Sequence, residues 1–158
     1  LAACGVRCPI TIAGSLESPE QRRSSVASGS RKSVEFRDKL ASGQVRSLLA
    51  GASIYAATSR YEPFGLAPLE AALSRCALVA NDIPTFRELW GPTAVYFSAN
   101  DADGLRAAVE TLRSDPSLRK HHSELAYQRA RRLFSADAMV EEYLSVYRSL
   151  VPERSMAA

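Results

Sequence analysis

Two carboxylates eight positions apart are the residues of this chain best suited to chemistry. The stretch RYEPFGLAPLE at 60–70 places Glu62 before a Phe-Gly turn and Glu70 after it. A carboxylate accepts two hydrogen bonds at once, which suits the paired hydroxyls of a sugar ring or a ribose. At ~1.5 Å of rise per helical residue, the two would be offset by about 7 Å along the axis. An ordinary surface role for both glutamates stays open, because the dipole at a helix start favours acidic residues.

The turn between the two glutamates predicts an anion site. The apolar run at 52–58 is typical of a strand that ends near Ser59, and Pro63 cannot extend a sheet interior. Gly65 permits a turn that a side chain would resist, and a helix begins at Leu66. Free N–H groups then face the carboxyl edge of the sheet, where open α/β sheets bind ligands. The turn therefore offers amides for a diphosphate, and the two carboxylates offer acceptors for two sugars. This combination fits a nucleotide-sugar as the ligand.

Short apolar runs separated by helical patterns predict the elements that must hold this turn. The expected strands are 9–14, 34–36, 52–58, 77–81 and 94–98. The expected helices between the later strands are 44–52, 66–75 and 85–90. Strand alternating with helix predicts an α/β fold, with a Rossmann-like parallel sheet and helices on both faces.

Beyond Ser98 the pattern is purely helical. One helix follows Asp101 and Asp103, and a second starts at Pro116. We interpret the acidic pair as charge at a helix start rather than as metal ligands. Ser135 caps the last helix, whose apolar stripe needs a partner to bury it and consists of Met139, Tyr143, Val146 and Tyr147.

Composition indicates a globular protein of one domain. The 158 residues are 46% hydrophobic and 23% charged, and the net charge is only +3. The basic clusters at 119–122 and 129–132 are typical of a solvated helix face, so no nucleic-acid partner is expected. Three cysteines in no metal-type pattern favour a reducing interior. We see neither a secretion signal nor a membrane span, and the Ser-, Arg- and Gly-rich segment at 15–32 predicts a surface loop.

The region from 59 to 89 resembles the retaining nucleotide-sugar glycosyltransferases with the GT-B fold, the large family 4 or group 1 type. That family has S-x-x-E-x-F-G, a second Glu eight positions after the first, an apolar strand, and D-x-P followed by R-E. The matching residues here are Ser59, Glu62, Phe64, Gly65, Glu70, Asp82, Pro84, Arg87 and Glu88. The resemblance covers nearly the whole chain, but only as the C-terminal, donor-binding half of such an enzyme.

The resemblance implies roles for Glu62, Phe64, Gly65, Leu66, Glu70, Lys39 and Leu40. Glu62 would be the catalytic residue that contacts the transferred sugar, and Glu70 would hold the nucleotide ribose. The turn amides at 64–66 would meet the sugar and the diphosphate. Residues 39–40 would lie against the base.

The implied reaction transfers a hexose from a UDP- or GDP-sugar to an acceptor hydroxyl with retention of configuration. The nucleotide-sugar would be a substrate, and no metal or other cofactor is implied. A sugar or lipid-linked acceptor would bind an N-terminal domain outside this chain. The expected setting is bacterial-type polysaccharide or glycoconjugate synthesis in the cytoplasm, which leaves open a peripheral position at the inner face of the membrane.

The resemblance also implies two parts for this chain. Residues 1–134 would form the nucleotide-sugar-binding domain, and residues 135–158 a C-terminal crossover helix and tail. The domain would be incomplete at its N-terminus, because the family's first strand and its cationic loop precede the run at 9–14. That strand should lie between 9–14 and 52–58 in the sheet.

Two further departures from the family are Asp38 and Arg75, which stand where the family often has Gly. Arg75 must accept a helix-end conformation that Gly adopts more cheaply. Three alternatives to a transferase stay open: a nucleotide-sugar epimerase, a sugar phosphorylase and a non-catalytic fragment. Pyridoxal phosphorylases are disfavoured, since no lysine is near the motif.

Overall fold

The computed structural model describes residues 8–14, 34–99 and 101–150. All five predicted strands are present, as β1 (Ile10–Ala13), β2 (Val34–Arg37), β3 (Ile54–Ala57), β4 (Ala77–Asn81) and β5 (Val95–Phe97). The helices between them are α2 (Ser42–Ala50), α3 (Leu66–Leu73) and α4 (Pro84–Trp90), with a 3-10 turn η2 (Gly91–Thr93) before β5. Helices α5 (Ala102–Ser114), α6 (Pro116–Leu133) and α7 (Ala136–Leu150) follow. The loop predicted at 15–32 falls outside the described residues.

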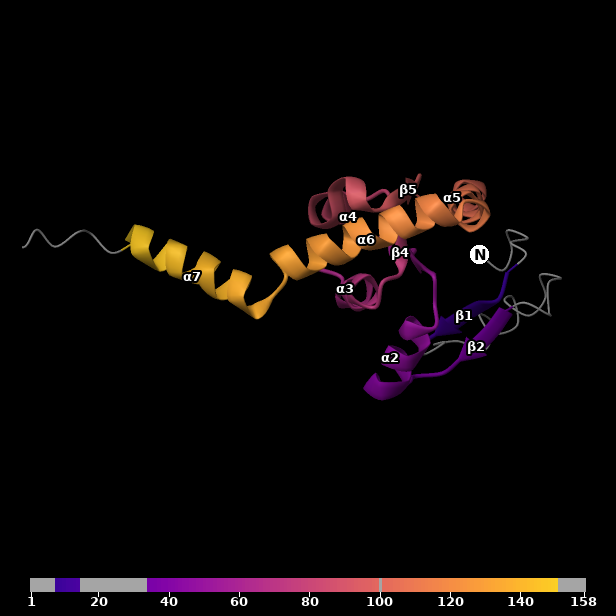
Figure 1. Ribbon diagram of the computed structural model, residues 1–158, viewed down its shortest axis with the longest axis horizontal. Coiled ribbons are helices and arrows are strands. Elements are labelled where there is room, and N and C mark those ends of the chain that lie inside the picture. The colour runs from indigo at the N-terminus through magenta and orange to yellow at the C-terminus, as the bar shows by residue number, and fades with distance from the viewer. Residues whose placement is uncertain (1–7, 15–33, 100, 151–158) are drawn as a thin grey trace, which may run out of the picture.

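The strands form two parallel sheets rather than one. In the first sheet β1 pairs with β2, and in the second the order is β3-β4-β5. Figure 1 shows β1 and β2 with α2 in the lower part of the molecule, while β4, β5 and α4 to α6 lie above. Strands β1 and β3 are the edges that the expected additional strand would join. The predicted strand order places that additional strand between β1 and β3, and its existence stays a prediction.

We expect the 158 residues expressed alone to be poorly soluble or partly unfolded, and inactive. Each facing edge would leave a row of N–H and C=O groups unpaired, which a folded domain does not tolerate in quantity. A longer version that adds one upstream strand and its helix should melt cooperatively without gaining activity, as circular dichroism and a donor assay would show. A sharp two-state transition and donor turnover by the 158 residues alone would contradict the strand order.

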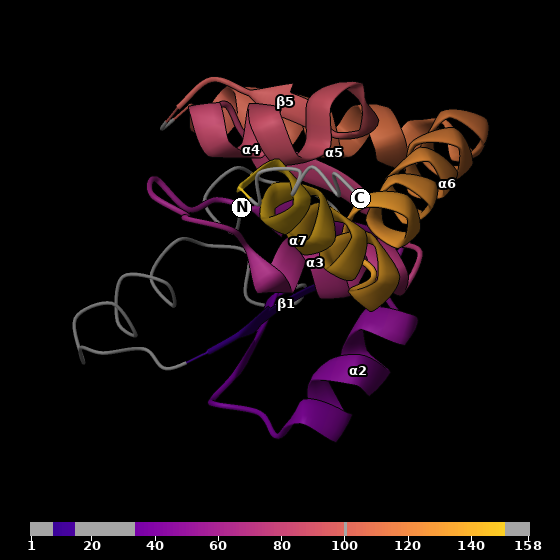
Figure 2. The same cartoon turned by 90° about the vertical axis from the view of Figure 1, so that its left-hand side faces the viewer.

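Strand β4 lies at the centre of the described core, and all five of its residues are buried. Side chains of α3, α4 and α6 pack on one face of it. Side chains of α5 pack on the other face. A strand buried on both faces is typical of a parallel sheet covered by helices on both sides. The predicted α/β architecture is therefore confirmed, and Figure 2 shows it from the end where α7 projects.

Arg75 adopts the left-handed conformation that the sequence predicted, with φ of 63°. The N–H of Arg75 donates to the carbonyl of Ala72, and the N–H of Cys76 donates to that of Ala71. This pair of hydrogen bonds is the Schellman motif, in which Gly is the usual residue. Contacts with α6 offset the backbone cost: the Arg75 guanidinium pairs with Glu124 and lies 3.9 Å from the Tyr127 ring centroid.

Two replacements of Arg75 should separate its backbone cost from its side-chain contacts. Arg75→Ala loses the contacts and keeps the left-handed strain, whereas Arg75→Gly loses the same contacts and relieves it. The Gly variant should therefore be more stable than the Ala variant by about 1 kcal/mol. Denaturant unfolding of the complete protein measures this difference. A Gly variant less stable than the Ala variant would show that the conformation at this position is not left-handed.

The C-terminal helices begin as predicted. The Asp101 carboxylate accepts from the N–H of Gly104 at 2.9 Å, and Asp103 pairs with Arg106 at 3.0 Å. The acidic pair is therefore charge at a helix start. The Ser135 hydroxyl oxygen accepts from the N–H of Ala138 at 3.1 Å, which caps α7.

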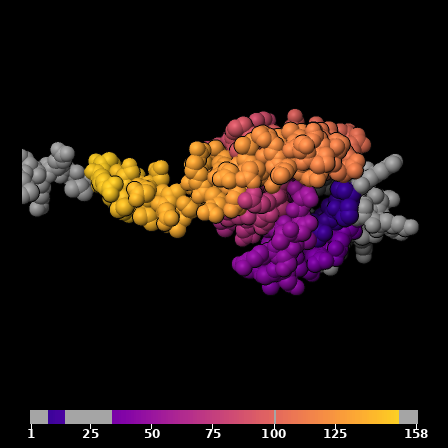
Figure 3. Space-filling model, viewed as in Figure 1, coloured from indigo at the N-terminus to yellow at the C-terminus, as the bar shows by residue number. Residues whose placement is uncertain are grey.

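Helix α7 extends away from the rest of the molecule (Figures 1 and 3). None of its residues is buried. Its predicted stripe is about half exposed, at 54% for Met139, 56% for Tyr143, 52% for Val146 and 58% for Tyr147. Within the described ranges the stripe thus has no partner. None of the described helices is both long and apolar enough to cross a membrane.

Candidate functional site

The turn between β3 and α3 is built around Gly65. Gly65 has φ of 82° and forms the N-cap of α3 without a side-chain capping bond. A Cβ at Gly65 would lie 3.2 Å from Cγ of Glu62 and 3.4 Å from Cγ of Pro68. Both the conformation and the crowding therefore select glycine. Pro68 lies in the first turn, where a missing N–H breaks no helical hydrogen bond.

The start of α3 has amide groups available for a ligand. The N-cap residue and the first residues of any α-helix have N–H groups without an intrahelical acceptor. In α3 these are the amides of Gly65, Leu66 and Ala67, and no side chain caps them. The positive end of the helix dipole adds to their effect. The turn after β3 thus presents N–H donors without a side-chain cap, and their binding of an anion stays a prediction.

Glu62 faces this helix start. Its side chain is half-buried, and the Ser59 hydroxyl donates to its Oε2 at 3.4 Å. Glu70, about one turn inside α3, is exposed. Both carboxylates affect the phenol of Tyr55. Burial raises the pKa of Tyr55, and the negative charges of Glu62 and Glu70 raise this pKa further. The structure therefore brings the two predicted carboxylates within electrostatic range of a single residue of β3.

Phe64 anchors the turn to the junction of α6 and α7. Its ring meets that of Phe134 edge-to-face, with centroids 5.5 Å apart at 84°. Phe134 in turn contacts Trp90, with centroids 5.8 Å apart. Leu66 is 67% exposed, so its predicted contact to a ligand would run through its backbone amide. The side chain of Phe64 therefore holds the turn, so that its predicted contact to a ligand would also run through the backbone.

The segment after β4 lies at the same carboxyl edge of the second sheet. Arg87 donates to both oxygens of Asp82, at 2.6 and 2.7 Å, and this bond holds the pKa of Asp82 below its usual value. The Arg87 guanidinium also lies 3.8 Å from the Tyr96 ring centroid. The D-x-P-x-x-R pattern therefore fixes a loop beside the turn.

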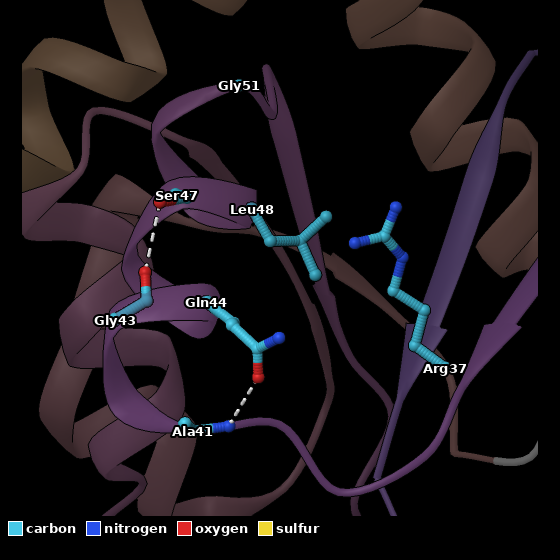
Figure 4. Close-up of a pocket in the computed structure, with 7 residues that line it drawn as sticks. All are labelled: Arg37, Ala41, Gly43, Gln44, Ser47, Leu48 and Gly51. Atoms are coloured by element: carbon cyan, nitrogen blue, oxygen red, sulfur yellow. Dashed lines mark hydrogen bonds between the residues drawn. The ribbon is translucent and has the colours of Figure 1, made fainter.

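The loop after β2 carries Lys39 and Leu40, the two residues predicted to lie against the nucleotide base. Neither residue lines the pocket beside this loop. The pocket measures about 590 Å³ and is lined by Arg37, Ala41, Gly43, Gln44, Ser47, Leu48 and Gly51 (Figure 4). Lys39 is exposed and its N–H donates to Asp38 at 3.1 Å, while Leu40 is half-buried. The side chain of Arg37 points across the pocket toward α2. The assignment of Lys39 and Leu40 to the base stays a prediction.

Three residues of this site were missed by the sequence analysis. Tyr55 was interpreted only as part of the apolar run at 52–58, and Phe134 was given no role. Asn81, at the end of β4, donates from its side-chain amide to the carbonyl of Ser59 at 3.1 Å. The one available signal was a polar residue closing the apolar run at 77–81. No group of three or more potential metal-ligating side chains occurs in the described parts of the chain.

The sequence matches the family model of glycosyl transferases group 1 over residues 5–129. The chain belongs to that family. It is 30% identical over 155 residues to the alpha-maltose-1-phosphate synthase of Mycobacterium tuberculosis, covering 89% of this chain and 40% of that protein. It is also 38% identical over 101 residues to the lipopolysaccharide core biosynthesis mannosyltransferase LpcC of Rhizobium leguminosarum bv. viciae, covering 63% and 29%. The chain thus spans about two fifths or less of the length of these relatives.

Solved structures share the fold of this group 1 domain. Anabaena Alr3699/HepE in complex with UDP superimposes with a TM-score of 0.82 at 20% identity, covering 95% of this chain and 44% of that one. Sucrose-phosphate synthase from Thermosynechococcus elongatus gives a TM-score of 0.76 at 22% identity, covering 94% and 41%. At these identities the likeness concerns the fold, and it confirms the predicted GT-B class.

Proposed function

We propose that this chain is the donor-binding domain of a retaining glycosyltransferase that transfers a hexose from a UDP- or GDP-sugar to an acceptor hydroxyl. The observation that carries the proposal is the uncapped start of α3 between Glu62 and Glu70. A diphosphate needs donors and a positive dipole, and the sugars on its two sides need acceptors. This turn supplies both within one segment.

The roles of the turn follow from the charges that develop in the reaction. The bond from the anomeric carbon to the diphosphate breaks, its electron pair leaves with the nucleoside diphosphate, and the acceptor oxygen bonds to the same carbon. The amides of residues 65–67 would stabilise the leaving diphosphate, because they are N–H donors fixed at the helix start before the negative charge develops. Retention brings the acceptor to the face that the diphosphate leaves, so a diphosphate oxygen can take the acceptor proton. Glu62 orients the sugar and Glu70 holds the ribose.

The names of the relatives support a sugar-transfer role. The relatives include a synthase of maltose-1-phosphate, a mannosyltransferase and a glycogen synthase. The HepE structures contain UDP, UDP with glucose, or UDP-glucose. We therefore favour bacterial-type polysaccharide or glycoconjugate synthesis in the cytoplasm. A peripheral membrane position would suit a lipid-linked acceptor.

The proposal includes a second domain outside these residues. Residues 1–134 would bind the nucleotide-sugar, and α7 would cross to a domain that binds the acceptor. The exposed stripe of α7 supports this, since Met139, Tyr143 and Tyr147 would be buried against that domain.

Donor turnover by the complete protein tests the proposal. UDP-glucose, GDP-mannose and ADP-glucose would each be incubated with the protein, with and without a panel of sugar acceptors. NMR would follow the anomeric proton. We expect one donor to be consumed with the product keeping the donor's anomeric configuration. Inversion would refute retention, and no consumption of any nucleotide-sugar across a wider set of bases and sugars would refute the proposal.

A further inference from the structure

Asn81 is a buried polar residue at the end of the central strand. Its exposed fraction is 2%, and the four other residues of β4 are apolar and buried. The Nδ2–H donates to the carbonyl of Ser59 at 3.1 Å, across 22 positions of sequence. The Oδ1 atom is buried and has no hydrogen-bond partner among the described residues. The bond to a carbonyl fixes which end of the amide faces the turn, because only the nitrogen can donate.

The segment that carries Glu62 depends on such side-chain contacts. Within the described ranges, residues 60–64 form no backbone–backbone hydrogen bond outside regular elements. The turn is instead held by the Asn81 bond to Ser59, the Ser59 bond to Glu62 and the ring contact of Phe64. At 3.4 Å, the Ser59 bond to Glu62 is longer than a usual O–H···O hydrogen bond and is the weakest of these three contacts.

The strand itself does not require the Asn81 side chain. The carbonyl of Asn81 accepts from the N–H of Ile83, and the N–H of Asp82 donates to the carbonyl of Phe97, so the backbone completes the end of β4. An orphaned buried oxygen costs stability, and such groups in native proteins call for an explanation beyond packing. The amide instead ties β4 to the turn that carries the proposed catalytic carboxylate.

We propose that Asn81 is a positioning residue that acts through Ser59 to fix Glu62 at the start of α3. This inference rests on the proposed function, because it gives Asn81 a part in orienting the transferred sugar. Asn81 would not touch the nucleotide. Its loss should therefore change turnover rather than nucleotide affinity.

Asn81→Leu in the complete protein tests this, since leucine has a similar size and removes both the donor and the orphaned oxygen. The probes are hydrolysis of UDP-glucose, GDP-mannose or ADP-glucose, whichever the wild type turns over, and calorimetric binding of the matching bare nucleoside diphosphate. We expect kcat to fall roughly tenfold, the size of one lost hydrogen bond, and the Kd to change less than about threefold. In a Glu62→Ala background, Asn81→Leu should cause no further fall in kcat.

Ser59→Ala provides a second variant that leaves the core untouched, should Asn81→Leu fold poorly. It should lower kcat in the wild-type background and leave it unchanged in the Glu62→Ala background. Thr93→Val is the matched control, because Thr93 is also buried and its hydroxyl donates to a backbone carbonyl, that of Trp90, at 2.6 Å. Thr93→Val should lower the melting temperature without lowering kcat.

The outcomes separate this inference from the function on which it rests. Suppose that the wild type is active and that the double variant loses kcat by the product of the factors for Asn81→Leu and Glu62→Ala. That result would overturn the positioning role and leave the proposed function intact. Weakened nucleotide binding in Asn81→Leu, with kcat intact, would overturn it as well. A wild type that neither hydrolyses a donor nor binds a nucleoside diphosphate would overturn the proposed function and the positioning role together.

Discussion

Replacing Glu62 by alanine in the complete protein should lower turnover roughly ten- to hundredfold while sparing nucleotide affinity. The expected size follows from one hydrogen bond to a charged group, worth ~1.5–3 kcal/mol. Nucleotide affinity should survive because the partner of Glu62 is the transferred sugar, which the bare nucleoside diphosphate lacks. Steady-state kinetics gives the turnover, and calorimetry with UDP or GDP gives the affinity.

Glu110→Ala is a suitable control for the Glu62 variant. Glu110 is a carboxylate on α5, paired with Arg113 at 2.6 Å, on the opposite face of β4 from α3. Surface ion pairs of this kind contribute ~0–1 kcal/mol, so turnover should stay at the wild-type value. Weaker nucleotide binding in Glu62→Ala, to the same degree as its loss of turnover, would contradict the assignment of Glu62 to the sugar.

Glu70→Ala should show the complementary result. We expect affinity for the bare nucleoside diphosphate and for the intact nucleotide-sugar to fall by the same factor, roughly ten- to hundredfold. The reason is that both ligands carry the ribose, and Glu70 is the carboxylate assigned to it. Turnover at saturating donor should change little, because an interaction equal in ground and transition states affects binding alone.

A 2′,3′-dideoxy nucleoside diphosphate provides the control for Glu70. Wild type should bind this ligand about as weakly as Glu70→Ala binds the normal nucleotide, and the variant should not discriminate between the two. Strong discrimination by the variant would show that another residue holds the ribose hydroxyls.

Local patterns predicted most of the fold because its signals are short-range. Apolar runs separated by helical periodicity located every strand from β1 to β5. Arg75 was predicted to adopt a helix-end conformation because it stands where the family often has Gly, and its φ of 63° confirms this. The interruption of the sheet between β1 and β3 was expected from the resemblance, which makes the run at 9–14 the second strand of the doubly wound order.

What the sequence could not predict depends on contacts between distant segments. The bond from Asn81 to Ser59 links the end of β4 to the segment that follows β3, and the Phe64 contact with Phe134 joins a turn to the end of α6. Neither contact has a local pattern, since a phenylalanine or asparagine at such a position suits many folds. In the loop after β2 the pocket is lined by Arg37 and Ala41, and the assignment of Lys39 and Leu40 to the base stays a prediction.

The most direct test of the account is a calorimetric titration of the complete protein with UDP, GDP and ADP, each without a sugar. The central claim is that the start of α3 binds the diphosphate of a nucleotide-sugar between Glu62 and Glu70. It predicts that at least one of these nucleotides binds in the millimolar range or tighter, and that Glu70→Ala weakens this binding. Failure of all three and of other nucleoside diphosphates to bind, or binding indifferent to Glu70→Ala, would contradict the claim.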